Sequence, residues 1–339
     1  MTMRTAVAFA AFSALAASGA IAAWGSDQKI DASTQYGPNP ALPEPSRGLL
    51  PTMNVPKVVG WKPGETPTVP PGFKIQAMAT GLSNPRRVYA LPNGDLLVVE
   101  SKKSGKEPIE RPKRPIMDWI EARAHGGGGG GPSNRILLLR DANGDGKPEM
   151  QTVLIDHLNA PFGVVLVGGD LYVADTDAIL RYPFTVGDTK VGGPATKVID
   201  LPGGPIDHHW TKDLTVSPDG SKLYVGVGSN SNAMERGVEA ETNRAAIWEV
   251  DPKTREFRVF ARGLRNPNGL TFYPGSNTLW AVINERDELG GNLVPDYMTS
   301  VKDGAFYGWP YSYWGSTSTS ACNRSVRTSS PRQSCPITR

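Results

Sequence analysis

Apolar and polar positions recur through the middle of the chain in one repeated pattern. A turn-like dipeptide precedes an apolar strand, a tight polar turn follows, and a second apolar strand completes the pair. The four copies cover residues 88–100, 164–175, 214–228 and 270–284. Each copy is predicted to form an antiparallel hairpin, because turns such as Pro92-Asn93-Gly94-Asp95 supply the positive-φ positions that a hairpin needs.

The second strand of each pair is a continuous apolar run, and the four runs are Leu96–Val99, Leu171–Ala174, Leu223–Gly226 and Leu279–Val282. Such runs are typical of strands that are covered on both faces. The first strands start 76, 50 and 56 residues apart, and a propeller blade takes about 40 to 50 residues. The pattern therefore predicts an all-β propeller with one blade per copy, in which the largest insertion is the loop 101–134.

The N-terminal region reads as a segment outside the propeller. Arg4 precedes an Ala-rich apolar run from Ala6 to Ala23, so residues 1–23 are predicted to be a signal peptide and the protein to be periplasmic or secreted. A short membrane anchor is the alternative. Residues 24–72 are rich in Pro and Gly and are predicted to form an extended lead-in. No later segment is long and apolar enough to span a membrane.

Composition narrows the choice of partners. The chain has 339 residues, 38 of them Gly and 30 Pro, which suits short strands joined by many turns. The formal net charge is +3, but four arginines lie in an acid-free C-terminal stretch, so the rest of the chain is close to neutral and nucleic acid is not an expected partner. Cys322 and Cys335 also lie in this stretch, so the main domain is expected to have no disulfide and no cysteine-based metal site.

Asp141, Asn143, Asp145 and Gly146 form an Asp-x-Asn-x-Asp-Gly run, which places oxygen ligands on alternate residues of a tight turn. The twelfth position is Thr152, where a helix-loop-helix calcium site has a bidentate Glu. A calcium-stiffened turn and a plain polar hairpin both remain open.

Two histidines precede the third strand pair in Asp207-His208-His209-Trp210. A neutral imidazole can remove a proton from an alcohol or a hydrated aldehyde. The alternative is that these histidines only hold loop carbonyls. Arg265 and Asn266 precede the fourth pair, and Arg is the natural partner of a planar carboxylate. Because His209 and Arg265 precede their strand pairs by a similar offset, we expect their side chains to converge on one face.

Oxygen-bearing residues follow the fourth pair in Asn284-Glu285-Arg286-Asp287, and an aromatic run lies at Phe306-Tyr307-Gly308-Trp309-Pro310. Carboxylate and amide oxygens at a strand end can hold a hard divalent cation, although surface turns use the same residues.

Four motifs together resemble the glucose/sorbosone dehydrogenase family, in particular its L-sorbosone dehydrogenase-like branch: HHWTKDLTVSPDG, GLRNPNGLTF, NERDELG and KDGAFYGWPYSYWG. The resemblance covers about residues 72–315. It implies a six-bladed propeller that binds pyrroloquinoline quinone (PQQ) and Ca²⁺ at the mouth of its channel. It also implies oxidation of a sugar hydroxyl or aldehyde in the periplasm, with electrons passed to an external acceptor.

The same resemblance implies roles for single residues. His209 matches the proton-abstracting histidine, Arg265 and Asn266 match the pair that contacts the quinone, and the backbone carbonyls of Glu285, Arg286 and Asp287 fall where calcium is held. The acidic residue that orients the histidine in glucose-oxidising relatives falls near Ser229, so Asp207 or Asp213 is expected to serve instead. A calcium-dependent lactone hydrolase and a non-catalytic binding propeller are the alternative functions.

Four repeats do not complete six blades. Residues 316–339 contain no acidic residue, no aromatic residue and no strand pattern, so this tail is expected to be disordered. Codons for a family-like continuation, read one base later, encode the Ser-Thr-Ser-Thr at 316–319. We therefore hypothesise a frameshifted or disrupted product with impaired activity; an exported domain with a different tail is the alternative.

Overall fold

The computed structural model describes residues 31–34, 40–45, 60–62, 64–103, 133–204, 206–314 and 317–318. The predicted signal peptide, most of the insertion 101–134 and nearly all of the tail 316–339 lie outside these ranges. The chain divides into two compact units, which are described separately. The smaller contains Met1–Val55 and Glu285–Pro295, and the larger contains Pro56–Asn284 and Asp296–Arg339.

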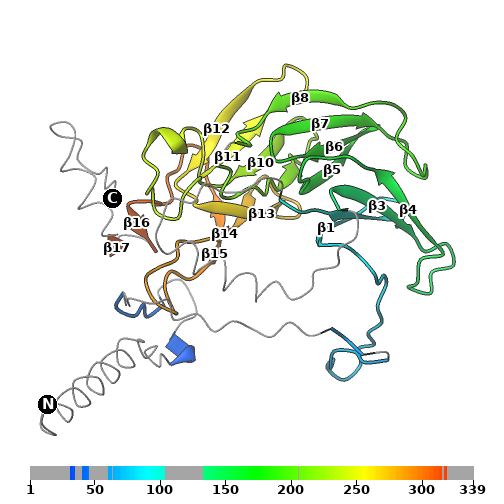
Figure 1. Ribbon diagram of the computed structural model, residues 1–339, viewed down its shortest axis with the longest axis horizontal. Coiled ribbons are helices and arrows are strands. Elements are labelled where there is room, and N and C mark those ends of the chain that lie inside the picture. The colour runs from blue at the N-terminus through cyan, green and yellow to red at the C-terminus, as the bar shows by residue number, and fades with distance from the viewer. Residues whose placement is uncertain are drawn as a thin grey trace, which may run out of the picture. The chain divides into compact units, whose positions relative to one another are not determined.

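The larger unit contains four antiparallel sheets that follow one another along the chain as propeller blades (Figure 1). Blade 1 consists of β1 (Pro85–Ala90), β2 (Leu96–Glu100), β3 (Arg135–Arg140) and β4 (Met150–Ile155). Blade 2 consists of β5 (Gly163–Val167), β6 (Asp170–Ala174), β7 (Ala178–Pro183) and β8 (Thr196–Asp200). Blade 3 consists of β9 (Leu214–Val216), β10 (Leu223–Val227), β11 (Ala246–Val250) and β12 (Phe257–Arg262). Blade 4 has three strands, β13 (Asn266–Phe272), β14 (Leu279–Asn284) and β15 (Tyr297–Val301).

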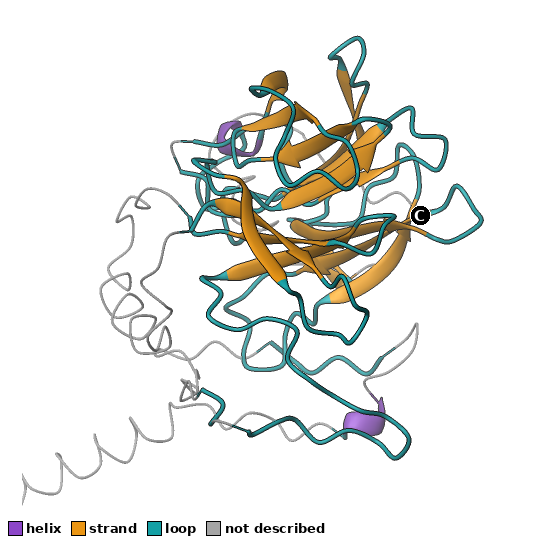
Figure 2. Ribbon diagram, turned by 90° about the vertical axis from the view of Figure 1, so that its right-hand side faces the viewer, coloured by secondary structure: helices purple, strands orange, loops and turns teal. Residues whose placement is uncertain are grey.

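Other regular structure in the described ranges is short. A two-stranded ribbon pairs β16 (Ser312–Tyr313) with β17 (Thr317–Ser318). Two 3-10 turns, Ala32–Thr34 and Glu239–Glu241, complete the set seen in Figure 2. No helix in these ranges has both the length and the apolar character needed to cross a bilayer.

All four predicted hairpins are confirmed. The second strand of each pair is hydrogen-bonded to the first, with Ala90 opposite Leu96 in blade 1 and Val167 opposite Asp170 in blade 2. The first strands of successive blades contact one another, β1 with β5, β5 with β9 and β9 with β13, so they line the middle of the propeller. Glycine permits this close approach: a Cβ at Gly163 would lie 2.5 Å from the backbone nitrogen of Leu214.

The core lies between blade faces. Leu97, Val99 and Leu138 of blade 1 pack in one buried cluster with Val164 and Val173 of blade 2. A second cluster joins blades 2 and 3, and a third joins blades 3 and 4. Full burial of one such aliphatic side chain is worth about 1.5 to 3 kcal/mol, so face-to-face packing of blades is the main stabilising term of this unit.

The prediction that every second strand is covered on both faces is confirmed for β2, β6 and β10 and is wrong for β14. Leu279, Ala281 and Ile283 of β14 are buried, but the intervening Val282 is 42% exposed. The buried residues pack in the cluster between blades 3 and 4, whereas the opposite face of β14 carries no such cover in the described part of the chain. An apolar run alone does not reveal which face is covered.

Candidate functional site

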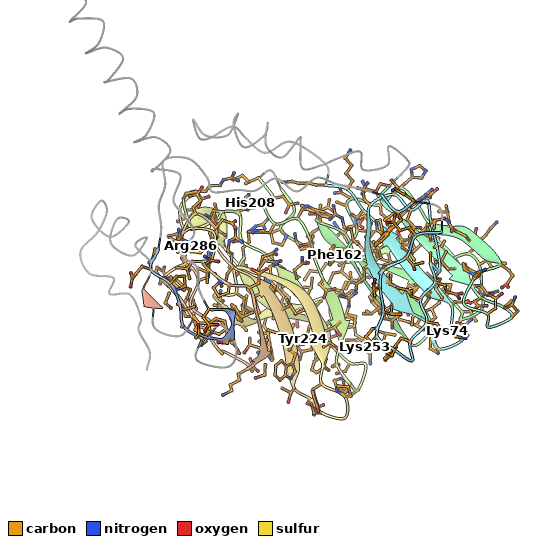
Figure 3. All side chains as sticks on the ribbon, turned by 90° about the horizontal axis from the view of Figure 1, so that it is seen from below. Lys74, Phe162, His208, Tyr224, Lys253 and Arg286 are labelled. Carbon is orange, nitrogen blue, oxygen red and sulfur yellow. The ribbon has the colours of Figure 1, made fainter. Side chains whose placement is uncertain are left out.

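Three short segments meet at one end of blades 3 and 4. They are the loop before β9, which carries His208 and His209, the segment after β10 from Gly228 to Asn232, and Arg265 and Asn266 at the start of β13. The nitrogen of Ser229 donates to the carbonyl of Arg265 at 2.8 Å, and the nitrogen of His209 donates to the carbonyl of Ser229 at 3.3 Å. The backbone therefore joins the three segments side by side. Figure 3 shows His208 at the end of the strands opposite to Lys253.

His209 is oriented by Ser229. Its Nδ1 lies 2.8 Å from the Ser229 carbonyl oxygen and 3.0 Å from the Ser229 hydroxyl. A carbonyl oxygen only accepts hydrogen bonds, so Nδ1 carries the proton and Nε2 carries the lone pair. Burial lowers the pKa of His209 well below its usual value, and the positive charge of Arg265 and the neighbouring His208 lower it further. His209 is therefore a neutral base at physiological pH.

Asn266 lies beside His209 with Gly228 between them. A Cβ on Gly228 would be 2.4 Å from the Cβ of His209 and 2.5 Å from Oδ1 of Asn266. Only glycine permits this approach. Asn266 Nδ2 donates to Oδ1 of Asn284 at 3.3 Å, while its own Oδ1 is buried and has no hydrogen-bond partner among the described residues. A buried acceptor of this kind costs free energy until a donor arrives.

Arg265 is held by Asn232. Its Nε donates to the Asn232 carbonyl at 3.1 Å and its Nη2 donates to the Asn232 side-chain oxygen at 2.9 Å. Its Nη1 lies 3.5 Å from the carbonyl of Asn284, at the limit of a hydrogen bond. The residue is only 3% exposed, so the guanidinium is fixed in orientation and weakly screened by water.

The expectation that Asp207 or Asp213 orients His209 is wrong. Asp213 instead accepts from the nitrogen of Leu270 at 2.6 Å and is paired with Arg87 at 2.9 Å, so it links blades 1, 3 and 4. Asp207 is paired with buried Lys212 and Arg244. Each carboxylate is paired with a cation, because a buried carboxylate needs such a partner, and the hydrogen-bond partner of the imidazole Nδ1 is Ser229.

An aromatic residue borders the site. The Trp210 ring meets the Phe162 ring edge to face, with centroids 6.3 Å apart, and the Arg86 guanidinium carbon lies 5.4 Å from the centre of the Trp210 ring. These contacts join Arg86 of β1 in blade 1, and Phe162 directly before β5 of blade 2, to the loop that carries His209.

His209, Arg265 and Asn266 were predicted to lie in loops before strand pairs, and the structure brings these three together. Gly228 and Asn232 were not predicted as parts of the site, and Ser229 was considered only as the position of a missing acid. The signal available was the run Gly228-Ser229-Asn230-Ser231-Asn232, small and polar directly after an apolar strand.

Glu285, Arg286 and Asp287 belong to the smaller unit. The Glu285 carboxylate accepts from the nitrogen of Arg286 at 3.1 Å, and the Arg286 carbonyl accepts from the nitrogen of Val294 at 3.2 Å.

Asp141, Asn143 and Asp145 form the β3–β4 turn, and Glu149 joins them, which the sequence spacing did not suggest. Carboxylate oxygens of Asp141, Asp145 and Glu149 lie within 4.8 Å of one another. The turn is also braced without a metal, since Asp141 accepts from the nitrogens of Gly144 at 2.8 Å and Gly146 at 2.7 Å. Both the calcium turn and the polar hairpin remain compatible with this geometry.

A family model described as TrAA12-like matches residues 135–313, just over half of the chain. Aldose sugar dehydrogenase YliI of Escherichia coli strain K12 is 39% identical over 105 residues, which cover 27% of this chain and 27% of that protein. An uncharacterized protein of Borreliella burgdorferi is 30% identical over 112 residues, covering 33% of this chain and 28% of that protein.

Solved structures show the same fold. The holo form of the pyranose dehydrogenase PQQ domain from Coprinopsis cinerea superposes with a TM-score of 0.53 at 18% identity, covering 72% of this chain and 58% of that chain. The calcium structure of the Trichoderma reesei family AA12 enzyme has a TM-score of 0.55 at 20% identity, covering 74% and 62%. The chain thus spans about three fifths of these structures and less than a third of the curated relatives.

Proposed function

We propose that this chain, which belongs to the TrAA12-like family, binds PQQ at the site of His209, Arg265 and Asn266 for the oxidation of a sugar hydroxyl or aldehyde. The observation that carries the proposal is the hydrogen bond from His209 Nδ1 to Ser229, which leaves Nε2 as a neutral base beside a fixed Arg. The names of the relatives support the reaction class, since they include an aldose sugar dehydrogenase and a PQQ domain.

The residues present fit the cofactor. PQQ carries carboxylates, for which a fixed guanidinium is a matched partner, and Arg265 supplies one. Asn266 Oδ1, buried without a partner among the described residues, can accept from a donor on the ligand. When bound, PQQ would supply the two-electron acceptor, and calcium would increase its electrophilicity.

The protein contributes a base of defined tautomer. A substrate hydroxyl placed at Nε2 of His209 transfers its proton there as the carbon is oxidised, and Ser229 keeps the ring oriented through Nδ1. The buried setting and the charge of Arg265, which lower the pKa of His209, favour release of that proton afterwards. The base is thereby returned to its neutral form for the next substrate.

For calcium we propose the backbone carbonyls of Glu285, Arg286 and Asp287, and for a second, structural ion the turn of Asp141, Asn143, Asp145 and Glu149. The chemistry supports both, because oxygen donors from carbonyls, amides and carboxylates are what Ca²⁺ takes. We also propose that residues 1–23 direct export and that an external acceptor removes the electrons.

A lactone hydrolase is less well supported. It would need unpaired carboxylates around a metal, whereas Asp207 and Asp213, the buried carboxylates of the loop before β9, are paired with cations.

The test is reconstitution of the purified chain with PQQ and calcium chloride. Because the chain spans part of its relatives, PQQ binding, followed by absorbance, comes before dye reduction with a panel of aldoses and sugar aldehydes. Saturable binding followed by sugar-dependent dye reduction supports the proposal. Absence of saturable PQQ binding would refute it.

A further inference from the structure

Two buried cations share one carboxylate beside the His209 loop. The side chains of Lys212 and Arg244 are 0% and 2% exposed. Lys212 Nζ lies 3.4 Å from Asp207 Oδ1, and Arg244 Nη2 lies 3.3 Å from the same oxygen. A buried cation is costly, and replacing such groups by apolar side chains is often neutral or stabilising. Stability alone therefore does not account for both cations.

Lys212 acts on the backbone of His209. Its Nζ donates to the carbonyl of Trp210 at 3.0 Å and lies 3.4 Å from the carbonyl of His209. These two carbonyls belong to the proposed base and to the residue that follows it. The hydroxyl of Thr176 lies 2.9 Å from the same Trp210 carbonyl and also contacts Asp207. Lys212 and Thr176 thus hold the loop through its backbone carbonyls and not through the imidazole.

Arg244 acts on the segment that orients the imidazole. Its Nη1 donates to the carbonyl of Gly228 at 2.8 Å, one residue before Ser229, and its Nη2 donates to the carbonyl of Pro202. Ser229 is the partner of His209 Nδ1. One cation therefore holds the loop of the base, the other holds the segment of its orienting partner, and Asp207 joins the two.

We propose that Lys212, Asp207 and Arg244 form a positioning cluster that sets the spacing between His209 and Ser229 and so fixes the protonated nitrogen of the imidazole as Nδ1. The inference rests on the proposed role of His209 as the base. Burial lowers the pKa of Lys212 to about 8, and the charge of Asp207 opposes this, as expected for a cation enclosed for geometric reasons. Lys212 is a positioning residue because, in the described part of the chain, its Nζ bonds to backbone carbonyls and to Asp207 rather than to the imidazole.

The test compares Lys212→Met with Lys212→Arg and with Lys222→Met. Lys222 is a matched control, since it is paired with Asp251 at 2.6 Å and is partly exposed. Lys212→Met leaves Asp207 with Arg244, a neutral pair, so the fold is expected to persist. The readout is the ¹⁵N-edited NMR spectrum of the four histidines, with His209 assigned by loss of its signals in His209→Gln.

In the parent and in Lys222→Met, His209 should show a single Nδ1–H tautomer and no protonation near pH 6.5. In Lys212→Met we expect a mixture of tautomers or a pKa raised toward 6.5, with PQQ binding within about threefold of the parent. Where turnover is measurable, kcat should fall about 10²-fold with KM little changed, the scale of a displacement of about 1 Å. Lys212→Arg should restore most of the parental spectrum.

If Lys212→Met does not fold, Arg244→Gln tests the other side of the cluster with the same expected His209 signals. A folded variant of either kind with the parental His209 spectrum overturns the proposal. If the His209 spectrum changes in Lys212→Met but neither the parent nor any variant shows PQQ-dependent turnover, the result supports the positioning cluster. The absence of turnover then counts against the dehydrogenase function only.

Discussion

Replacing Gly228 with alanine places a methyl group between the two loops of the site. The added Cβ would lie 2.4 Å from the Cβ of His209 and 2.5 Å from Oδ1 of Asn266. Carbon atoms in ordinary contact are about 3.5 to 4.0 Å apart, so a movement of about 1 Å is required. His209 Cβ is attached to the backbone, and rotation of the imidazole does not relieve the contact. The loop before β9 must therefore move away from Gly228.

The displacement caused by Gly228→Ala should lower both the stability and the turnover of the protein. Overpacking of this kind typically costs about 1 to 3 kcal/mol of stability, which a urea titration of parent and variant measures directly. A displacement of about 1 Å between base and substrate reduces turnover by about 10²-fold, which PQQ-dependent dye reduction measures. Gly169→Ala is the control, because no atom lies within 4 Å of the added Cβ there. Gly228→Ala with parental stability and a parental His209 NMR spectrum would refute the close packing on which the site depends.

Three further substitutions test separate contacts. Burial raises the pKa of Asp175 from 3.8 to about 7, so between about pH 4 and pH 7 the unfolded chain loses this proton while the folded chain keeps it. Stability should fall over that range by about 4 kcal/mol at most, and the full loss should be present above pH 7. Asp175→Asn should therefore raise the urea midpoint at pH 8, and an equal gain at pH 4 would contradict this. The pKa of His209 is lowered, so below about pH 6.5 the unfolded chain takes up a proton that the folded chain does not. Stability should therefore fall toward pH 5, by up to about 1.4 kcal/mol per pH unit from this group. His209→Gln should remove that slope and should also reduce turnover by about two to four orders of magnitude. Ser229→Ala removes the hydroxyl 3.0 Å from His209 Nδ1 but keeps the carbonyl at 2.8 Å, so turnover should fall less than about tenfold, and a loss equal to that of His209→Gln would show that the hydroxyl is essential.

The blades were predictable where local signals agreed. Apolar runs followed polar turns in all four hairpins, and each turn contained a residue suited to positive φ, as Gly94 and Gly220 show. The third strands were visible in part, since Ile136–Leu139 is also a continuous apolar run. The outer strands β4, β8 and β12 were not, because they mix exposed and buried residues and carry little periodic signal.

The site was predictable only as far as single loops. His209 and Arg265 each precede a strand pair, which places them at the same end of neighbouring blades. The orienting role of Ser229 depends on a backbone carbonyl, and every residue type supplies one. The shared carboxylate of Lys212 and Arg244 joins residues that lie 32 positions apart in the chain, and no local pattern indicates such a contact.

We propose that the loop site binds PQQ through Arg265 and uses His209 as the base. The most direct measurement is an equilibrium titration of PQQ, in calcium-containing buffer, into the parent chain, Arg265→Gln and His209→Gln. We predict saturable binding to the parent, affinity within about threefold in His209→Gln, and affinity reduced at least about tenfold in Arg265→Gln, because a charge-assisted bond to a carboxylate is lost. Parental affinity in Arg265→Gln, or no saturable binding to the parent, would contradict the account.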